Sequence, residues 1–250
     1  MNHGYLIYCL LASAAMAQDA RQIMQESEKR GQVKSQRYEG VLQVFESNGR
    51  MREKRWVYER TGSYGNSKAM LRFTGPPEVK GIALLIANRP DRASEQWMWT
   101  PAIGRERRIA LQDRSTRFFG TDFSFEDMEE RDLDQFDFKL QGEDNVGGTQ
   151  CWRIEATPKQ TKASQYTNLV LWVSKDHYVT TQLDAHVKDE VVRRLKYLEI
   201  GDVQGIWSAR ALVMTDLKRK SHTLLKLDKL EYNSPMKDEA FTVQALRLGQ

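Results

Sequence analysis

The stretch that decides the fold runs from Leu71 to Met128 and reads LRFTGPPEVKGIALLIANRPDRASEQWMWTPAIGRERRIALQDRSTRFFGTDFSFEDM. Three short segments within it have the aliphatic, aromatic or alternating residues of strands, and Pro or Gly residues separate them. They span residues 81–87, 96–99 and 105–109. This pattern predicts neighbouring strands of an antiparallel sheet that are joined by short turns.

The first of these segments is apolar on both faces of the predicted strand. Successive side chains of a strand point to opposite faces, so Ile82, Leu84 and Ile86 share one face. The residues between them, Ala83 and Leu85, are apolar too. Since a strand that is apolar on both faces is buried on both, we expect one face to line a concave interior and the other to lie under a helix or loop.

Segments with strand character continue on both sides of this stretch, at intervals of about ten residues. The dipeptide Asn48-Gly49 is a strong hairpin signal between the first two of them. Further strands are predicted at residues 38–45, 54–59, 69–73, 136–140, 150–156, 168–174, 179–187, 191–200, 207–217 and 223–232. One antiparallel sheet of this length must curl to bury a face. We therefore expect a mainly β (α+β) fold with a barrel or half-barrel, and a two-sheet sandwich is the alternative.

Short helices complete the predicted elements. Residues 19–29 have few apolar positions and are followed by a glycine, which is typical of a short surface helix. Ser124 and Asp127 have the spacing of a capping box, which predicts a helix of about two turns that ends at Arg131. A last helical turn or more is expected within residues 238–246.

The N-terminus has the pattern of an export signal. Residues 4–14 are apolar, and residues 15–17 (AMA) match the small-x-small pattern of a signal-peptidase site. We expect cleavage before Gln18, which removes residues 1–17 and leaves residues 18–250 as a single exported domain. The alternative is that the apolar segment forms the first helix or strand of the domain.

The composition is that of a globular protein with a mixed surface. The 250 residues include 38 Lys and Arg and 34 Asp and Glu, which gives a formal net charge of +4. So small a surplus argues against nucleic-acid binding and is compatible with transient contact with an anionic membrane surface. Cys9 would leave with residues 1–17, so Cys151 would have no disulfide partner and is expected to be a small buried hydrophobe.

No arrangement of residues predicts catalysis or metal binding. The chain has no G-x-S-x-G, P-loop, G-x-G-x-x-G or C-x-x-C motif, and its four histidines lack metal-ligand spacing. We interpret the acidic residues within 122–130 as caps of the predicted helix, not as acid–base groups. Arg105, Arg107 and Arg108 are expected to be solvated or to pair with that helix. We therefore expect no enzyme activity, no cofactor and no metal.

Large apolar side chains on the predicted strands are the candidate functional residues. Trp97 and Trp99 share a face of one strand, and Trp56 and Tyr58 share a face of another. Such rings bury large areas with few rotatable bonds. We predict an apolar cavity wall that consists of Trp56, Tyr58, Leu71, Phe73, Ile82, Leu84, Ile86, Trp97, Trp99, Ile109 and Phe119. The alternative is an interior that the protein fills with its own side chains.

Several motifs of the chain resemble the signature of a known family. They are Leu71-Arg72-Phe73, Pro76-Pro77, Lys80-Gly81, Leu84-Leu85, Trp97-Met98-Trp99-Thr100-Pro101, Arg107-Arg108-Ile109 and the segment 119–128, which reads FGTDFSFEDM. These motifs resemble the LolA-like family of outer-membrane lipoprotein-sorting proteins. The segment 119–128 is typical of one branch of this family and not of the true lipoprotein carrier. The resemblance therefore implies a lipid-like cargo more strongly than a lipoprotein.

The resemblance implies an unclosed antiparallel β-barrel, formed by a single curled sheet with short helices covering its mouth. It also implies a cavity for the acyl chains of a lipid or lipoprotein, which the protein would carry through the periplasm toward the outer membrane. It further implies that the protein functions together with an inner-membrane transporter of the resistance-nodulation-division (RND) type. We expect the protein to be a monomer. The alternative is a periplasmic adaptor that docks on a membrane transporter and carries no lipid.

Overall fold

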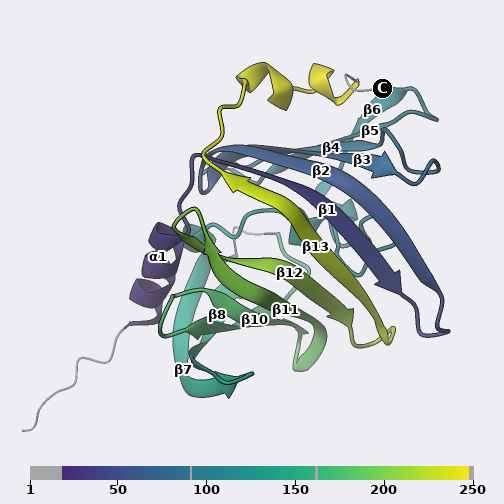
Figure 1. The fold of residues 1–250 in the computed structure, drawn as a ribbon. Coiled ribbons are helices and arrows are strands. Elements are labelled where there is room, and N and C mark those ends of the chain that lie inside the picture. The colour runs from purple at the N-terminus through teal and green to yellow at the C-terminus, as the bar shows by residue number, and fades with distance from the viewer. Residues whose placement is uncertain (1–18, 91, 161–162, 248–250) are drawn as a thin grey trace, which may run out of the picture.

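The protein forms one antiparallel sheet that curls around a concave interior. A computed structural model describes residues 19–90, 92–160 and 163–247. In these residues thirteen strands lie side by side in the order β6-β5-β4-β3-β2-β1-β13-β12-β11-β10-β9-β8-β7 (Figure 1). Because β6 and β7 are the two edges and do not pair, the sheet is not closed into a barrel.

Consecutive strands pair with each other within β1–β6 and within β7–β13, and β1 also pairs with β13, which joins the two halves of the sheet. Their bounds are β1 Ser35–Phe45, β2 Met51–Ser63, β3 Asn66–Gly75, β4 Ala83–Ala87, β5 Glu95–Thr100, β6 Arg105–Arg108, β7 Phe136–Val146, β8 Thr149–Pro158, β9 Asn168–Ser174, β10 Thr180–Val187, β11 Glu190–Val203, β12 Ile206–Asp216 and β13 Ser221–Tyr232. The predicted fold class is confirmed, and the alternative of two packed sheets is wrong.

The two faces of β4 are buried in two different hydrophobic clusters, as its sequence predicts. Leu84 and Ile86 belong to the inner cluster, which occupies the concave side of the sheet. Ala83 and Leu85 belong to the outer cluster, which lies on the convex side. The outer cluster consists of Met70, Ala83, Leu85, Trp99, Phe241, Ala245 and Leu246. The convex face of β3–β5 is therefore covered by the C-terminal segment (Figure 1).

The C-terminal segment contains two short 3-10 helices, η4 (Asp238–Phe241) and η5 (Gln244–Arg247). Arg72 on β3 holds this segment, because its guanidinium donates hydrogen bonds to the carbonyl oxygens of Ala245 and Leu246, both at 2.9 Å. The predicted helical turns near the C-terminus are confirmed as these 3-10 helices.

Residues 109–135 connect β6 to β7 and are called the interior segment here. They contain three 3-10 helices: η1 (Leu111–Asp113), η2 (Glu126–Met128) and η3 (Leu133–Gln135). Phe118 of this segment is fully buried, and its ring lies 5.8 Å from the rings of both Trp56 and Phe73, measured between centroids. The interior segment thus packs against the concave face and supplies part of the inner cluster.

The helix predicted to run from Ser124 through Arg131 is wrong in length. Its capping box does form, because the Ser124 backbone N–H donates to the Asp127 carboxylate at 2.8 Å and the Asp127 N–H donates to Ser124 Oγ at 3.3 Å. Only the 3-10 helix η2 follows, since Glu129 is already extended, with a ψ of 155°. The acidic side chains beyond the cap, Glu129 and Glu130, pair with Arg114 and with Arg60 on β2.

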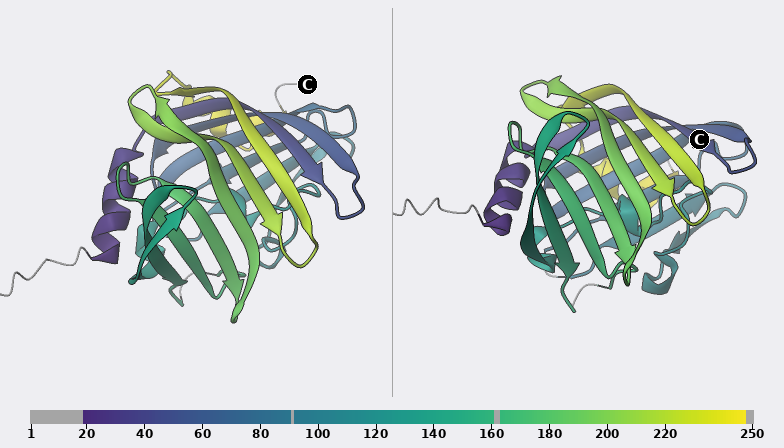
Figure 2. Two further views of the ribbon diagram at one scale, coloured as in Figure 1. Left: turned by 60° about the horizontal axis from the view of Figure 1, so that its bottom comes forward. Right: turned by 90° about the horizontal axis from the view of Figure 1, so that it is seen from below.

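The α-helix α1 (Ala20–Arg30) confirms the predicted N-terminal helix. Asp19 caps it by accepting a hydrogen bond from the Arg21 backbone N–H. Its one apolar stripe, which contains Ile23 and Met24, is buried in the inner cluster. The helix therefore lies against one end of the curled sheet, as both views of Figure 2 show.

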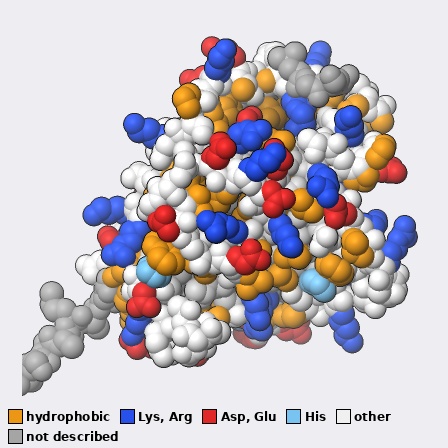
Figure 3. All heavy atoms as spheres, in the orientation of Figure 1, with side chains coloured by type: hydrophobic (Ala, Val, Ile, Leu, Met, Phe, Trp, Pro, Cys, Tyr) orange, Lys and Arg blue, Asp and Glu red, His pale blue; other side chains and the backbone are white. Residues whose placement is uncertain are grey.

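The predicted signal peptide, residues 1–17, lies outside the residues that the structure describes. None of the helices in the described ranges has the length and hydropathy that a membrane-spanning helix requires. The surface carries charges of both signs, and Figure 3 shows Lys and Arg side chains interspersed with Asp and Glu over one face. This agrees with the small net charge of +4.

Candidate ligand-binding site

A cavity of about 750 Å³ lies on the concave side of the sheet. Its walls come from β1, β2, β11, β12 and β13, from the C-terminal end of α1, and from the turns β9–β10 and β11–β12. The interior segment forms the remaining wall with Phe123, Asp127, Met128 and Arg131. Pockets of roughly 300–1,000 Å³ with mostly apolar walls are typical of small-molecule sites.

Aromatic and aliphatic side chains from neighbouring strands make up most of the cavity wall. Tyr38 on β1 and Tyr58 on β2 are cross-strand partners, and their rings stack with centroids 4.8 Å apart. Burial raises the pKa of both phenols above the ordinary value, so both remain neutral. Aliphatic residues from β11, β12 and β13 form the opposite wall, and they are Leu195, Leu212, Leu225 and Leu227.

The position of Trp56 in this wall depends on a glycine on the neighbouring strand. Gly40 is the cross-strand partner of Trp56, and the indole lies directly over the glycine backbone. A Cβ atom at position 40 would lie 1.8 Å from Trp56 Nε1. Only glycine leaves space for the ring there, because real Cβ contacts are much longer than this distance.

The rim of the cavity is formed by α1 and two hairpin turns. His177 in the β9–β10 turn stacks on Trp207 at the start of β12, with ring centroids 3.5 Å apart. The Arg30 guanidinium, at the end of α1, lies 4.1 Å from the ring centroid of Tyr178. Trp207 is 40% exposed, although tryptophan is a residue type that is usually buried. The rim is therefore aromatic and in contact with solvent.

Four arginine–carboxylate pairs stabilise the interior segment, two by joining it to strands of the sheet and two within the segment itself. Their carboxylates are all from the interior segment, and their arginines come from β2, β11 and the segment itself. The pairs are Arg60–Glu130, Arg114–Glu129, Arg117–Asp122 and Arg193–Asp127. Because all four carboxylates are at least largely buried, each pair is far less screened than a surface ion pair would be.

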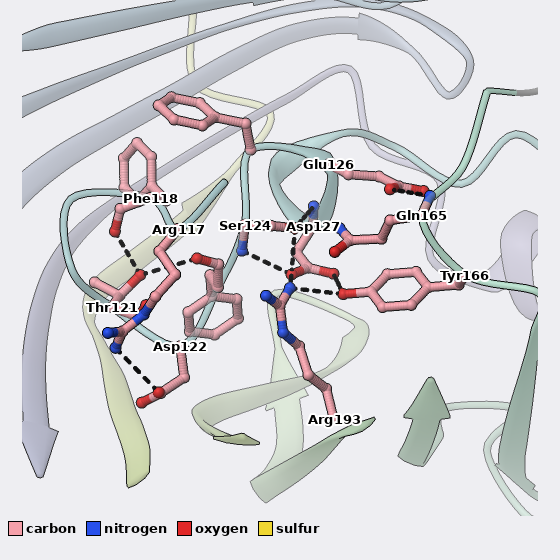
Figure 4. Close-up of polar contacts among 12 residues, drawn as sticks. Arg117, Phe118, Thr121, Asp122, Ser124, Glu126, Asp127, Gln165, Tyr166 and Arg193 are labelled. Atoms are coloured by element: carbon pink, nitrogen blue, oxygen red, sulfur yellow. Dashed lines mark hydrogen bonds and ion pairs between the residues drawn. The ribbon is translucent and has the colours of Figure 1, made fainter. Parts of the chain in front are cut away.

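Asp127 is the most highly coordinated of these carboxylates (Figure 4). It accepts hydrogen bonds from the backbone N–H and the hydroxyl of Ser124, from the Tyr166 hydroxyl at 2.9 Å and from Arg193 at 2.8 Å. Arg193 also donates to the Tyr166 oxygen at 2.7 Å. This network ties η2 to β11 and to the segment before β9, and it neutralises the Asp127 charge.

Asp122 makes a second attachment of the interior segment, to the strand β13. Its carboxylate accepts hydrogen bonds from the hydroxyls of Ser221 and Thr223, and its backbone N–H donates to Thr223 Oγ1 at 2.9 Å. Arg117 donates to the same carboxylate at 3.2 Å (Figure 4). Asp122 is completely buried, so these donors replace the water that the charge would otherwise require.

The acidic residues of the interior segment are therefore structural anchors more than helix caps. Capping was predicted for all of them, and only Asp127 takes part in a capping box. The arginines predicted to pair with them also differ from those that do. Arg108 pairs with Glu95 on the neighbouring strand, and the anchoring arginines lie elsewhere in the sequence. Arg60 and Arg193 lie far from Glu130 and Asp127 in the sequence, so no local pattern indicates these two pairs.

The structure assembles most of the predicted cavity wall on the concave side, but it covers much of it. Nine of the eleven predicted residues belong to the inner cluster or pack against it: Trp56, Tyr58, Leu71, Phe73, Ile82, Leu84, Ile86, Ile109 and Phe119. Only Trp56 and Tyr58 line the cavity. The others lie in the half of the concavity that the interior segment fills, as Gln96 on β5 shows by donating to the Phe125 carbonyl at 2.9 Å.

The prediction of one shared wall is wrong for Trp97 and Trp99, which lie on the convex side. Trp99 belongs to the outer cluster and Trp97 packs against it. The reason is the register of β5 against β4, in which Trp97 is opposite Leu85 and Met98 is opposite Leu84. Since cross-strand partners share a face, the two tryptophans face outward with Leu85.

Sequence reasoning missed most residues of the actual cavity. Tyr38, Tyr197 and Leu212 lie on strands that were predicted correctly, and Tyr38 lies between the polar residues Arg37 and Glu39, as a residue on an inner face does. That signal identifies the face but not the part of it that stays uncovered.

No group of three or more His, Cys, Asp or Glu side chains in the described ranges could hold a metal ion.

An open, curled antiparallel sheet with a cavity on its concave side is the LolA-like fold, and comparisons with solved structures agree with this class. A DUF1329 family protein from Desulfovibrio piger has a TM-score of 0.87 at 24% identity, over 91% of this chain and 97% of that chain. A putative outer membrane lipoprotein-sorting protein domain from Vibrio parahaemolyticus has a TM-score of 0.86 at 22% identity, over 91% of this chain and 98% of that chain. The predicted resemblance is thereby confirmed at the level of the fold.

A more distant structure has the same fold, and a family model matches the sequence. A LolA superfamily protein from Nitrosomonas europaea has a TM-score of 0.70 at 15% identity, over 90% of this chain and 97% of that chain. Residues 65–248 match the model of a family described as "Uncharacterized protein", and the chain belongs to that family. No curated protein sequence matches the chain.

Proposed function

We propose that this protein is a periplasmic carrier or chaperone that binds the acyl chains of a lipid or lipoprotein. The observation that carries this proposal is the cavity of about 750 Å³, with its aromatic and aliphatic walls on the concave side of an open sheet. Each methylene exposed to water costs about 0.8 kcal/mol, so a long acyl chain costs on the order of 10 kcal/mol. A protein that moves such a chain through water needs an apolar container of this kind.

The supporting comparison is the likeness in fold to a putative lipoprotein-sorting domain and to a LolA superfamily protein. Export of the chain after cleavage near Ala17 would place the carrier between the two membranes. The cargo would then move toward the outer membrane, with transient contact at a membrane surface. No step here needs catalysis by the protein, because binding and release of an acyl chain break no covalent bond.

The experiment is native mass spectrometry of the protein purified from a periplasmic extract. We expect co-purified lipid on the wild-type protein and none on Leu212→Trp, because the larger ring fills the cavity beside β11–β13. The matched control is Leu198→Trp, the same substitution at an exposed site on the strand next to β12. It should retain lipid as the wild type does.

Wild-type protein that is empty and also fails to bind fluorescent fatty acids would exclude the carrier. The alternative is then an adaptor without cargo, for which the inner-membrane transporter of the RND type is the proposed partner. A cross-linking pull-down from membranes tests that partner. If the protein is an adaptor, wild type and Leu212→Trp should capture the transporter equally well, because docking would not require an open cavity.

A further inference from the structure

The cavity contains one positive charge that the protein itself does not neutralise. Its charged lining residues are Arg30, Asp127 and Arg131, apart from a histidine at the rim. Arg30 pairs with Glu26 at 2.8 Å, and Asp127 pairs with Arg193 at 2.8 Å. Within the described ranges, the Arg131 guanidinium has neither a carboxylate partner nor a hydrogen bond, and only the Arg131 backbone bonds to Tyr64.

Arg131 remains charged in this position. Burial disfavours the charged form, but the nearby Tyr197 and Asp127 outweigh it and raise the pKa of Arg131 above its ordinary value. Asp127 is already saturated with donors, so it is not free to act as a full counter-ion for a second arginine. Arg131 is therefore a half-buried, charged guanidinium whose N–H donors are free, among the described residues, to bind an anion that enters the cavity.

The Trp56 indole in the same wall also has an unpaired donor, but its nitrogen lies against the Gly40 backbone and not at the cavity surface. Trp56 is 1% exposed, and in the described part of the chain its Nε1–H has no hydrogen-bond acceptor. The indole N–H can only donate. Within the described ranges, the cavity wall therefore offers a ligand one unpaired cation, Arg131, and its single carboxylate is occupied. A ligand with negatively charged acceptor oxygens complements this wall, whereas a neutral hydrocarbon leaves the Arg131 guanidinium without an acceptor.

We propose that the cavity selects amphiphiles with an anionic head group, a carboxylate or a phosphate, and that Arg131 is the residue that pairs with it. This inference rests on the proposed carrier function and names its ligand class. The planar guanidinium matches both head groups, since it can donate two parallel hydrogen bonds to the oxygens of either. The Leu225 and Leu227 side of the cavity then holds the acyl chain.

The test compares two probes that share a chain and a fluorophore and differ only in charge. They are 11-(dansylamino)undecanoic acid and its methyl ester, titrated into delipidated protein. We expect wild type to bind the acid about tenfold or more tightly than the ester, as charge-assisted hydrogen bonds are worth about 1.5–3 kcal/mol. Arg131→Gln should lose this preference and bind the ester as wild type does, and Arg131→Lys should retain part of it.

The matched control is Arg37→Gln, which removes an arginine from the convex face of β1, where it pairs with Glu59. It should keep the full preference for the acid. Equal binding of acid and ester by wild type would overturn the inference and leave the carrier function standing. Loss of both probes by Arg131→Gln, with an unchanged thermal midpoint, would also overturn it.

Two further outcomes distinguish an amphiphile head group from a free anion, and the proposed ligand preference from the proposed carrier function. Acetate and inorganic phosphate are added as competitors, and neither should displace the acid at millimolar concentration. Displacement would identify a site for free anions and overturn the amphiphile proposal. Wild type that binds neither probe would refute the carrier function itself, and the inference would fall with it.

Discussion

Gly40 shows how one residue determines the shape of the cavity wall. In a strand, glycine has no side chain to pack and is normally unfavourable. Here the missing side chain is the reason for its presence, because the indole of Trp56 occupies the space above it. The ring in turn contacts Phe73 and Phe118, with centroids 5.7 and 5.8 Å away. One backbone position thereby sets the packing between the sheet and the interior segment.

Gly40→Ala is expected to destabilise the protein by about 1–3 kcal/mol, the typical cost of forcing extra atoms into a well-packed core. Urea unfolding followed by tryptophan fluorescence measures the change. The control is Gly201→Ala on β11, where an added Cβ would meet no atom within 4 Å. Equal stability of Gly40→Ala and Gly201→Ala would contradict the close approach of Trp56.

At the scale of elements, the interior segment behaves as a folded insert that ion pairs hold in place. It has little regular structure of its own, only three short 3-10 helices. Its carboxylates reach arginines on β2 and β11, and Asp122 also reaches hydroxyls on β13. These contacts connect both halves of the sheet across the concave side. They explain how an open sheet keeps a fixed curvature without closing.

Asp127→Asn should cost about 3–5 kcal/mol, because removing one partner of a buried pair leaves Arg193 charged and uncompensated. The Asp127 carboxylate is 3% exposed, so solvent cannot take over its role. Differential scanning calorimetry measures the loss.

The matched control for this prediction is Glu190→Gln, which breaks an ion pair with Lys218 in which both side chains are more than 60% exposed. A surface pair of this kind is worth about 0–1 kcal/mol. Similar losses for Asp127→Asn and Glu190→Gln would show that the interior segment does not depend on its buried pairs.

At the scale of the whole molecule, the concave side is divided into a filled half and an open half. The interior segment packs against β2–β5, and the cavity remains beside β1, β2 and β11–β13. The filled half gives the sheet a continuous core, and the open half has aromatic side chains at its rim. The packed core and the open cavity thus lie on largely different strands of one sheet, with β2 contributing to both.

A ligand that enters the open half should stabilise the whole molecule. At a ligand concentration of about 100 times Kd the expected gain is roughly 2.7 kcal/mol, which corresponds to a rise in Tm of about 5–10 °C for a domain of this size. Thermal unfolding with increasing oleate measures it, and a Tm that does not depend on oleate concentration would contradict an open cavity.

Much of the fold could be predicted because its signals are local. The alternation in residues 38–45 and the Asn48-Gly49 turn predict β1 and its hairpin, and the apolar run 81–87 predicts a strand buried on both faces. The site could be predicted less well. Tyr58 was expected in the wall and lines the cavity, whereas Leu84 was expected there and lies under the interior segment.

What the sequence determined by itself was the strand pattern, the open curled sheet implied by the family resemblance, and the lack of a catalytic motif. Only the tertiary structure decided which apolar residues stay uncovered, which face Trp97 and Trp99 occupy, and that the Arg131 guanidinium has no carboxylate or hydrogen-bond partner among the described residues. The physical reason is the range of the interactions. Alternation and turns depend on neighbours in the chain, whereas register, ion pairs and covering segments depend on residues that meet only when the sheet curls.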